Sequence, residues 1–257
     1  MVHPACCTRA FLAAVTGAFL MTPMEVTLAQ TRPSLSVAES CLMANQRLSL
    51  GTRLPRTAAR LKAGGPLKVV AVGSSSTTGL WVLSSAATYP EVMRRELGRL
   101  RPDLRIEMVN SGRIGKTIPG DITRLDRDVL AYRPDLVVWQ LGTNDVVWGG
   151  RVDGLKDQIV QGIRAIKTSG ADVVLMDLQY TPVVLASSGH SPMQDIIAEA
   201  ARQERVGLFP RFVLMRQAVD AGLPPSALVS WDGLHNSADG YNCIGRALAR
   251  AIYAAAR

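Results

Sequence analysis

Short apolar runs alternate with helical segments along most of the chain, and this alternation constrains the fold more than any other feature. Five runs read as strands, at residues 67–73, 104–110, 135–142, 171–179 and 207–212. The intervening helical patterns fall at 89–100, 120–133, 155–170, 193–206, 212–222 and 237–256. Strands that alternate with helices predict a parallel sheet with helices on both faces. The expected fold class is therefore α/β.

Length and charge agree with a globular α/β domain. The chain has 257 residues, 47% of them apolar and 19% charged, which is enough to bury a sizeable core. The net charge of +8 comes largely from arginines scattered along the chain, and only 5% of the residues are aromatic. Without a long basic run, we expect no nucleic-acid partner. A basic solvated surface is the first reading of the charge, and attraction to anionic glycans or lipid headgroups is the second.

The N-terminus has the features of a secretion signal over residues 1–29. Arg9 precedes an apolar core at 11–21, and the small-residue sequence at 27–29 resembles a cleavage site. The apolar core is too short to span a bilayer. We therefore expect a secreted or periplasmic protein with no membrane span after cleavage.

An N-terminal arm at 30–65 is expected to precede the main domain at 66–257. An amphipathic pattern at 36–50 predicts a helix within this arm. After loss of the signal, Cys41 in the arm and Cys243 in the last helix are the remaining cysteines. In an oxidising compartment they could form a disulfide. Two separate buried thiols are an equally good reading.

Polar clusters follow three successive strands. The sequence GSSST occupies 73–77, NSG occupies 110–112 and GTND occupies 142–145. In parallel sheets, ligands bind beyond the carboxyl ends of the strands. The three clusters are therefore expected to form one site.

The histidines limit the choice of a catalytic base. His3 lies in the signal, His190 in a loop after the fourth strand, and His235 just before the last helix. Asp232 precedes His235 by three residues, a spacing at which a carboxylate can orient an imidazole. The other reading is a capping aspartate beside a surface histidine.

A nucleophile would come from the hydroxyl residues at 74–78, each of which needs a base to remove its proton. The backbone N–H of Gly112 and the amide of Asn144 are candidate donors to an oxyanion. An Asn-Ser-Gly turn also needs no catalytic reason. The residues alone leave the choice among the hydroxyls open.

These blocks, in this order, resemble those of the SGNH hydrolase superfamily, also called the GDSL esterase/lipase family. The resemblance covers roughly residues 67–256 and places Ser75 at the nucleophile. It implies a Ser75, His235 and Asp232 triad. It also implies an oxyanion hole made of the Ser75 N–H, the Gly112 N–H and the Asn144 amide. The implied fold is a three-layer α/β/α sandwich with a central, mostly parallel five-stranded sheet.

One residue departs from the family pattern. Ser74 stands where the family usually has the aspartate of Gly-Asp-Ser. Serine makes similar, weaker hydrogen bonds to neighbouring backbone. The change therefore affects the expected rigidity of the loop more than the chemistry.

The implied function is an exported serine hydrolase that cleaves a carboxylic ester, either of an acetylated glycan or of a lipid-like acyl group, through an acyl-enzyme. An acyltransferase that passes the group to a glycan, or a non-catalytic binding module on the same scaffold, are the alternatives. A phosphate-binding protein is disfavoured because the loop at 73–79 lacks a Walker-type Gly-Lys-Ser/Thr. The sequence predicts no cofactor and no metal site.

Further residues are weaker candidates. His190 competes with His235 for the role of base, although a surface position is the simpler reading. Trp81, Trp148 and Tyr180 follow strand ends and could line an acyl or sugar pocket, or could simply pack.

Overall fold

The computed structural model describes residues 36–37, 39–41, 49–149 and 152–257. The predicted signal at 1–29 lies outside the described residues. Of the helix expected at 36–50, only residues 37 and 39–41 are described as helical.

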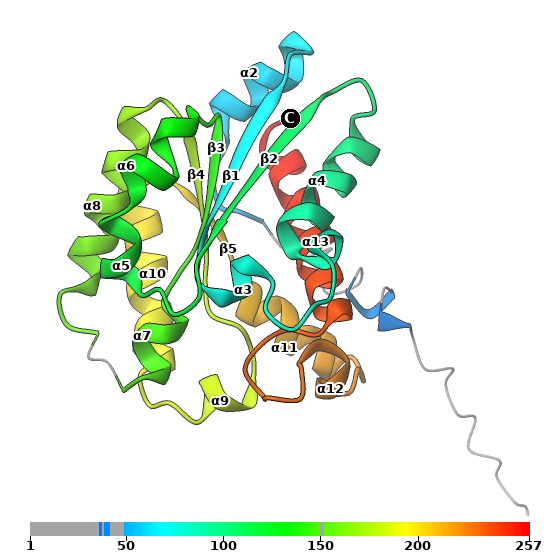
Figure 1. The fold of residues 1–257 in the computed structure, drawn as a ribbon, viewed down its shortest axis with the longest axis vertical. Coiled ribbons are helices and arrows are strands. Elements are labelled where there is room, and N and C mark those ends of the chain that lie inside the picture. The colour runs from blue at the N-terminus through cyan, green and yellow to red at the C-terminus, as the bar shows by residue number, and fades with distance from the viewer. Residues whose placement is uncertain (1–35, 38, 42–48, 150–151) are drawn as a thin grey trace, which may run out of the picture. The chain divides into compact units, whose positions relative to one another are not determined.

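The core of the domain is one five-stranded sheet, all of it parallel, in the order β2-β1-β3-β4-β5 (Figure 1). Its strands are β1 (Leu67–Gly73), β2 (Ile106–Gly112), β3 (Leu136–Gln140), β4 (Asp172–Met176) and β5 (Gly207–Phe209). The predicted fold class is confirmed. Because the strands are parallel, their carboxyl ends lie along one edge, where the polar clusters begin.

Helices cover both faces of the sheet. One face carries α2 (Pro55–Ala63), α4 (Tyr89–Leu100), α11 (Arg211–Asp220) and α13 (Ala238–Ala255). The other carries α5 (Ile118–Ile122), α6 (Leu125–Asp128), α8 (Leu155–Thr168) and α10 (His190–Glu204). Alternate residues of β1 divide between the two cores, with Val69 on the first face and Val70 on the second. The strands β1, β3 and β4 are largely apolar because both of their faces are buried, whereas the edge strand β2 is only partly buried.

Short helical turns follow several strand ends and loops. They are α3 (Ser75–Thr78), η1 (Ser85–Ala87), η2 (Leu130–Tyr132), α7 (Thr143–Val147), α9 (Pro182–Leu185) and α12 (Pro225–Leu228). The two that matter most are α3, directly after β1, and α7, directly after β3. They turn the sequences GSSST and GTND back across the edge of the sheet.

The strand expected to end at Asn110 runs two residues further. Ser111 and Gly112 pair with Val72 and Gly73 of β1, so the Asn-Ser-Gly sequence is strand and not a turn. Glycine is required at 112, because a Cβ there would lie 2.3 Å from the Thr78 backbone nitrogen. The close approach of α3 to β2 therefore depends on this residue.

The prediction of a single helix over 120–133 is also wrong. It is broken into α5, α6 and η2, with non-helical backbone at Arg124 and Val129. The Arg124 side chain is buried and donates to the Gly73 carbonyl at 3.0 Å and to the Ser111 carbonyl at 2.8 Å. This guanidinium ties the ends of β1 and β2 together, and Arg124 has its non-helical backbone at the N-cap of α6, where the expected helix is interrupted.

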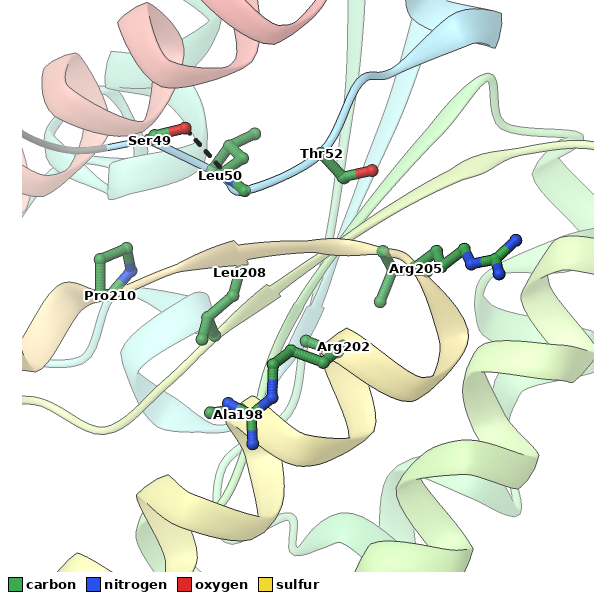
Figure 2. Close-up of a pocket in the computed structure, with 11 residues that line it drawn as sticks. Ser49, Leu50, Thr52, Ala198, Arg202, Arg205, Leu208 and Pro210 are labelled. Carbon is green, nitrogen blue, oxygen red and sulfur yellow. Dashed lines mark hydrogen bonds between the residues drawn. The ribbon is translucent and has the colours of Figure 1, made fainter.

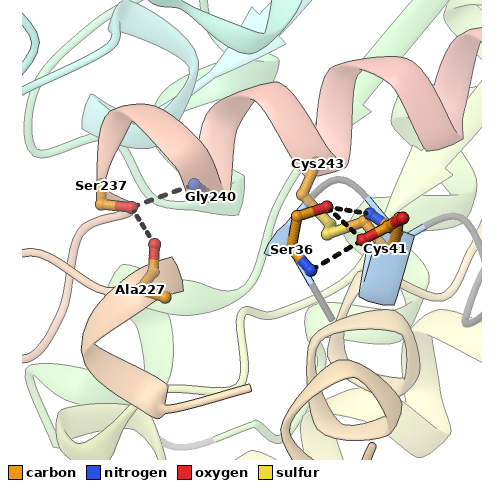
Figure 3. Close-up of a disulfide and its surroundings, with 7 residues drawn as sticks. Ser36, Cys41, Ala227, Ser237, Gly240 and Cys243 are labelled. Atoms are coloured by element: carbon orange, nitrogen blue, oxygen red, sulfur yellow. Dashed lines mark hydrogen bonds between the residues drawn. A yellow bond between two sulfur atoms is a disulfide. The ribbon is translucent and has the colours of Figure 1, made fainter. Parts of the chain in front are cut away.

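A disulfide joins Cys41 to Cys243 of α13, with a Cα–Cα distance of 5.6 Å (Figure 3). The sequence had left this pairing open. The start of α13 is capped by Ser237, whose hydroxyl accepts from the Gly240 N–H at 3.0 Å and donates to the Ala227 carbonyl. The N-terminal arm is thus held covalently to the last helix.

The arm also makes polar contacts with the sheet. The Asp172 carboxylate at the start of β4 accepts from the N–H and the hydroxyl of Thr57 in α2, at 2.7 and 2.8 Å. The Asp135 carboxylate accepts from Arg56 and Arg60. In the described ranges, no helix combines the length and apolar character that crossing a bilayer requires.

Candidate active site

The end of β1 turns sharply into α3, and this turn presents Ser75. Gly73 has φ +151°, and a Cβ on it would lie 2.6 Å from the Gln140 carbonyl oxygen. Only glycine fits this conformation and this close approach. Ser75 is the first residue of α3 and follows immediately beyond the edge of the sheet.

Ser74, the residue that departs from the family pattern, is buried against β3. The side-chain oxygen of Gln140 accepts from the Ser74 N–H at 3.0 Å and from the Ser74 hydroxyl at 2.9 Å. The Thr77 hydroxyl donates to the same oxygen at 3.2 Å. The loop is therefore braced by Gln140, a residue that sequence reasoning had assigned only to a strand.

The structure brings together the three predicted triad residues. Ser75 Oγ lies 2.8 Å from His235 Nε2, and His235 Nδ1 lies 2.6 Å from Asp232 Oδ2. When Ser75 donates to Nε2, the ring proton sits on Nδ1 and faces Asp232. This is the order of contacts that transfers a hydroxyl proton to an imidazole held by a carboxylate.

The Asp232 carboxylate is held in its charged form. Oδ1 accepts from the backbone N–H groups of Leu234 and His235, each at 3.0 Å, and Oδ2 also accepts from Trp81 Nε1 at 2.7 Å. Partial burial alone raises the pKa of this carboxyl. The hydrogen bonds from His235, Leu234 and Trp81 outweigh it and lower the pKa to about 2.

The candidate oxyanion donors differ in availability. The Ser75 N–H has no acceptor among the residues that the structure describes. Asn144, in α7, uses its side-chain NH₂ to donate to the Lys116 carbonyl at 2.9 Å, which leaves its second N–H. The Gly112 N–H, however, donates to Asn110 Oδ1 at 3.0 Å. It therefore already has a partner.

A second glycine, three residues after Gly112, is another candidate for that role. Gly115 has φ +76° and precedes Lys116, the residue whose carbonyl Asn144 contacts. A Cβ on Gly115 would lie 3.3 Å from Trp148, which directly follows α7. Within the described ranges its N–H has no acceptor. The resemblance had assigned this role to Gly112, and Gly115 was not among the sequence-based candidates.

A buried network supports the loop that carries His235. Gln179 donates to the Leu234 carbonyl at 3.1 Å and accepts from the Thr143 hydroxyl at 2.8 Å. The fully buried Arg211 donates to the same Gln179 oxygen at 2.7 Å. The loop before α13 is thus fixed to α7 and α11 by side chains that no local motif reveals.

Three buried carboxyls, those of Asp121, Asp145 and Asp177, have raised pKa values. Burial, opposed by the Arg124 guanidinium, raises the pKa of Asp121. Burial, opposed by the hydrogen bond from the Ile118 N–H, raises the pKa of Asp145 to about 6. Burial, opposed by Phe212 and Arg211, raises the pKa of Asp177 to about 7.

The weaker candidates separate into two groups. His190 Nδ1 lies 2.7 Å from the Ser187 carbonyl oxygen, and its ring stacks on Phe212. Tyr180 packs edge-on against the same Phe212. Trp81 and Trp148, in contrast, are half or more exposed near the site. The sequence missed the contact of Trp81 with Asp232, because the two residues lie 151 positions apart.

A hollow of about 540 Å³ lies elsewhere on the domain, between residues 49–52, α10 and β5 (Figure 2). Arg202 and Arg205 are among its lining residues. None of the predicted site residues lines it. The described residues contain no group of three or more His, Cys, Asp or Glu side chains able to hold a metal ion.

Comparison with known proteins identifies relatives of this arrangement. Residues 40–257 match the Non-GDSL lipase-like family. An arylesterase of Vibrio mimicus is 29% identical over 153 residues, which are 56% of this chain and 76% of the relative. An acetylxylan esterase of Geobacillus stearothermophilus is 28% identical over 163 residues, 59% of this chain and 74% of the relative.

Among solved structures, a two-domain esterase active on acetylated mannans superposes with a TM-score of 0.68 at 18% identity. The match covers 80% of this chain but only 55% of that protein. The chain therefore corresponds to little more than half of the two-domain esterase. At this identity the likeness concerns the fold alone.

Proposed function

The chain belongs to the Non-GDSL lipase-like family, within the SGNH hydrolase superfamily, and on that premise we propose that it is an exported serine esterase that works through Ser75, His235 and Asp232. The observation that carries the proposal is the continuous line of contacts from Ser75 Oγ through His235 to Asp232, at 2.8 and 2.6 Å. The arylesterase and acetylxylan esterase relatives support an ester-cleaving hydrolase.

In the proposed reaction, His235 Nε2 takes the hydroxyl proton as Ser75 Oγ bonds to the ester carbonyl carbon. Asp232 stabilises the resulting imidazolium, and its low pKa keeps it charged during this step. The alcohol leaves with the proton from His235. Water then attacks the acyl-enzyme, with His235 as base again, and releases the acid.

The oxyanion is proposed to bind the Ser75 N–H, the side chain of Asn144 and one glycine N–H. Gly112 serves only if Asn110 releases its N–H, whereas the Gly115 N–H is free of an acceptor in the described part of the chain. We therefore favour Gly115 over Gly112 for this role.

The proposed organisation is a cleaved signal at 1–29, an arm at 30–65 and an SGNH domain at 66–257. The disulfide between Cys41 and Cys243 supports export, because such bonds persist in oxidising compartments. The proposed substrates are small-molecule, glycan or lipid-like esters, and no nucleic acid is expected to bind.

Hydrolysis of 4-nitrophenyl esters of graded chain length, with the secreted protein and its Ser75→Ala variant, tests the proposal. We expect turnover by the native protein and a loss of about 10³-fold or more in the variant. An unchanged rate in Ser75→Ala would exclude this nucleophile. Formation of acylated sugar in place of free acid, when a glycan acceptor is added, would identify an acyltransferase instead.

A further inference from the structure

Among the residues that the structure describes, Trp81 is the one outside the Asp232–His235 loop whose side chain donates to the Asp232 carboxylate. Its Nε1 lies 2.7 Å from Oδ2, the same oxygen that faces His235 Nδ1 at 2.6 Å. The other donors, the backbone N–H groups of Leu234 and His235 and the His235 ring, belong to the loop itself. The indole therefore fixes the carboxylate relative to α3, which carries Ser75.

The backbone of Trp81 is held in an unfavourable conformation. Its φ is +71°, a region that bulky residues rarely adopt. The other two described non-glycine residues with positive φ, Arg133 and Arg205, follow the last turn of a helix, where this conformation is common. Trp81 has no such role. Strain of this kind persists when surrounding contacts impose it, and it concentrates at functional sites.

The indole that supports Asp232 is also open to solvent. Trp81 is 50% exposed and Trp231, next to Asp232 in the chain, is 80% exposed. Their ring centroids lie 5.0 Å apart with the planes tilted by 59°. Two large apolar rings thus stand at the surface beside the carboxylate, where a ligand can cover them.

We propose that Trp81 is a positioning residue for Asp232, and that the Trp81–Trp231 pair is a binding platform for a ring with an apolar face carried by the ester substrate. The proposal rests on the proposed function of Ser75. The Trp81 indole has both roles, since its N–H donates to Asp232 while its ring contacts the substrate. Binding of the ring therefore favours the aligned triad.

The platform fits an aryl ring or the apolar face of a pyranose ring. Flat rings stack on exposed indoles over their whole face. A slender alkyl chain gains less here, because it covers less of each exposed indole face than a ring does. The two tryptophans can therefore recognise a ring in the substrate.

Two sulfonyl fluorides test this without knowledge of the natural ester. Methanesulfonyl fluoride has no ring and phenylmethanesulfonyl fluoride has one. In each case Ser75 Oγ bonds to sulfur, the S–F bond breaks, fluoride leaves, and the hydroxyl proton passes through His235 to solvent. The rate constant of inactivation reports triad alignment, and the concentration for half-maximal rate reports binding. Intact mass measures the adduct.

Three variants separate the roles. Trp81→Phe keeps a ring but loses the N–H, and should slow inactivation by both reagents about tenfold, as expected for one hydrogen bond to a charged group. Trp231→Ala should weaken binding of the phenyl reagent alone, by about fivefold. Leu83→Ala, in the same exposed segment as Trp81, is the control and should change neither. Thermal unfolding checks that all three fold.

Protection by benzyl alcohol or by methyl β-xyloside then distinguishes an aryl from a sugar ring. Protection by one of the two supports the platform, and protection by neither contradicts it. Wild-type rates in a folded Trp81→Phe would overturn the positioning role, and equal effects of Trp231→Ala on both reagents would overturn the ring preference. If the native protein forms no Ser75 adduct, the proposed function fails as well. If the native protein forms the Ser75 adduct but Trp81→Phe and Trp231→Ala are inactivated like the native protein, only this inference is refuted.

Discussion

The side-chain oxygen of Gln140 accepts hydrogen bonds from both the backbone N–H and the hydroxyl of Ser74, at 3.0 and 2.9 Å. This pair connects the loop that carries Ser75 to the centre of the sheet. It also explains how a serine serves at a position where relatives of this superfamily usually have an aspartate. The neighbouring strand supplies the acceptor that the loop needs.

We expect Ser74→Ala to lower the free energy of unfolding by about 1 kcal/mol, because one buried hydrogen bond is lost. Ser74→Asp should cost more, since a carboxylate would be buried against the oxygen of Gln140. Urea unfolding of both variants measures the difference. A Ser74→Asp variant as stable as the native protein would show that Gln140 does not define this loop.

The steric role of Gly112 gives a second prediction. Gly112→Ala places a methyl group 2.3 Å from the Thr78 nitrogen, so β2 and α3 must separate. We expect a loss of about 2 kcal/mol or more in stability, as for other overpacked sites. Gly98→Ala is a matched control, because a Cβ there meets nothing within 4 Å. Similar unfolding midpoints for the two variants would contradict the close approach.

Structural features that depend on residues close together in the sequence were predicted correctly, and features that depend on distant contacts were not. β1 was predicted with its observed bounds because an apolar run ends on a glycine. The Asn-Ser-Gly end of β2 was not, because its local turn propensity yields to pairing with Val72 and Gly73. The break at Arg124 depends on a side chain that turns inward to bind two strand ends.

In the candidate site, too, the residues in short motifs were predicted and their long-range contacts were not. The blocks around Ser75 and His235 were visible because each lies in a short motif. The supports from Trp81, Gln140 and Gln179 were not, because they join segments far apart in the sequence. The Cys41–Cys243 pairing likewise required coordinates, since spacing alone does not bring two Cα atoms to 5.6 Å.

The disulfide gives a third prediction. Cys41→Ser with Cys243→Ser should lower the free energy of unfolding by about 2–5 kcal/mol, since the bond closes a loop across 202 positions. The native protein should lose the same amount when unfolded with dithiothreitol present, and the double variant should not respond to it. Unfolding that is insensitive to the reductant in both proteins would argue against the bond.

Asp145 gives a prediction for pH. Its native pKa of about 6 lies above its ordinary value of 3.8, so the native state holds this proton more tightly than the unfolded state. Its carboxyl therefore reduces stability increasingly as pH rises from about 4 to 6, by up to roughly 3 kcal/mol at pH 7. Asp145→Asn removes this cost and keeps an oxygen to accept from the Ile118 N–H.

We expect Asp145→Asn to gain stability over the native protein at pH 7 and to lose that advantage near pH 4. Unfolding titrations across this range measure it. A constant difference between the two proteins at all pH values would contradict the raised pKa.

The two candidate bases are compared directly by substitution. His235→Ala removes the ring 2.8 Å from Ser75 Oγ and should lower kcat by about 10³-fold or more. His190→Ala removes a ring that contacts the Ser187 carbonyl and Phe212, so its effect on kcat should be small. The reverse order of the two losses would reject His235 as the base.

The most direct test of the central claim is to locate the acyl group on the protein. The purified protein is mixed with 4-nitrophenyl acetate, quenched in acid within the first turnover, digested and analysed by peptide mass. We predict one acetyl group on the peptide that contains Ser75, with release of one equivalent of 4-nitrophenol, and no such adduct in Ser75→Ala. An acetyl group found on another residue, or undiminished turnover by Ser75→Ala, would contradict the account.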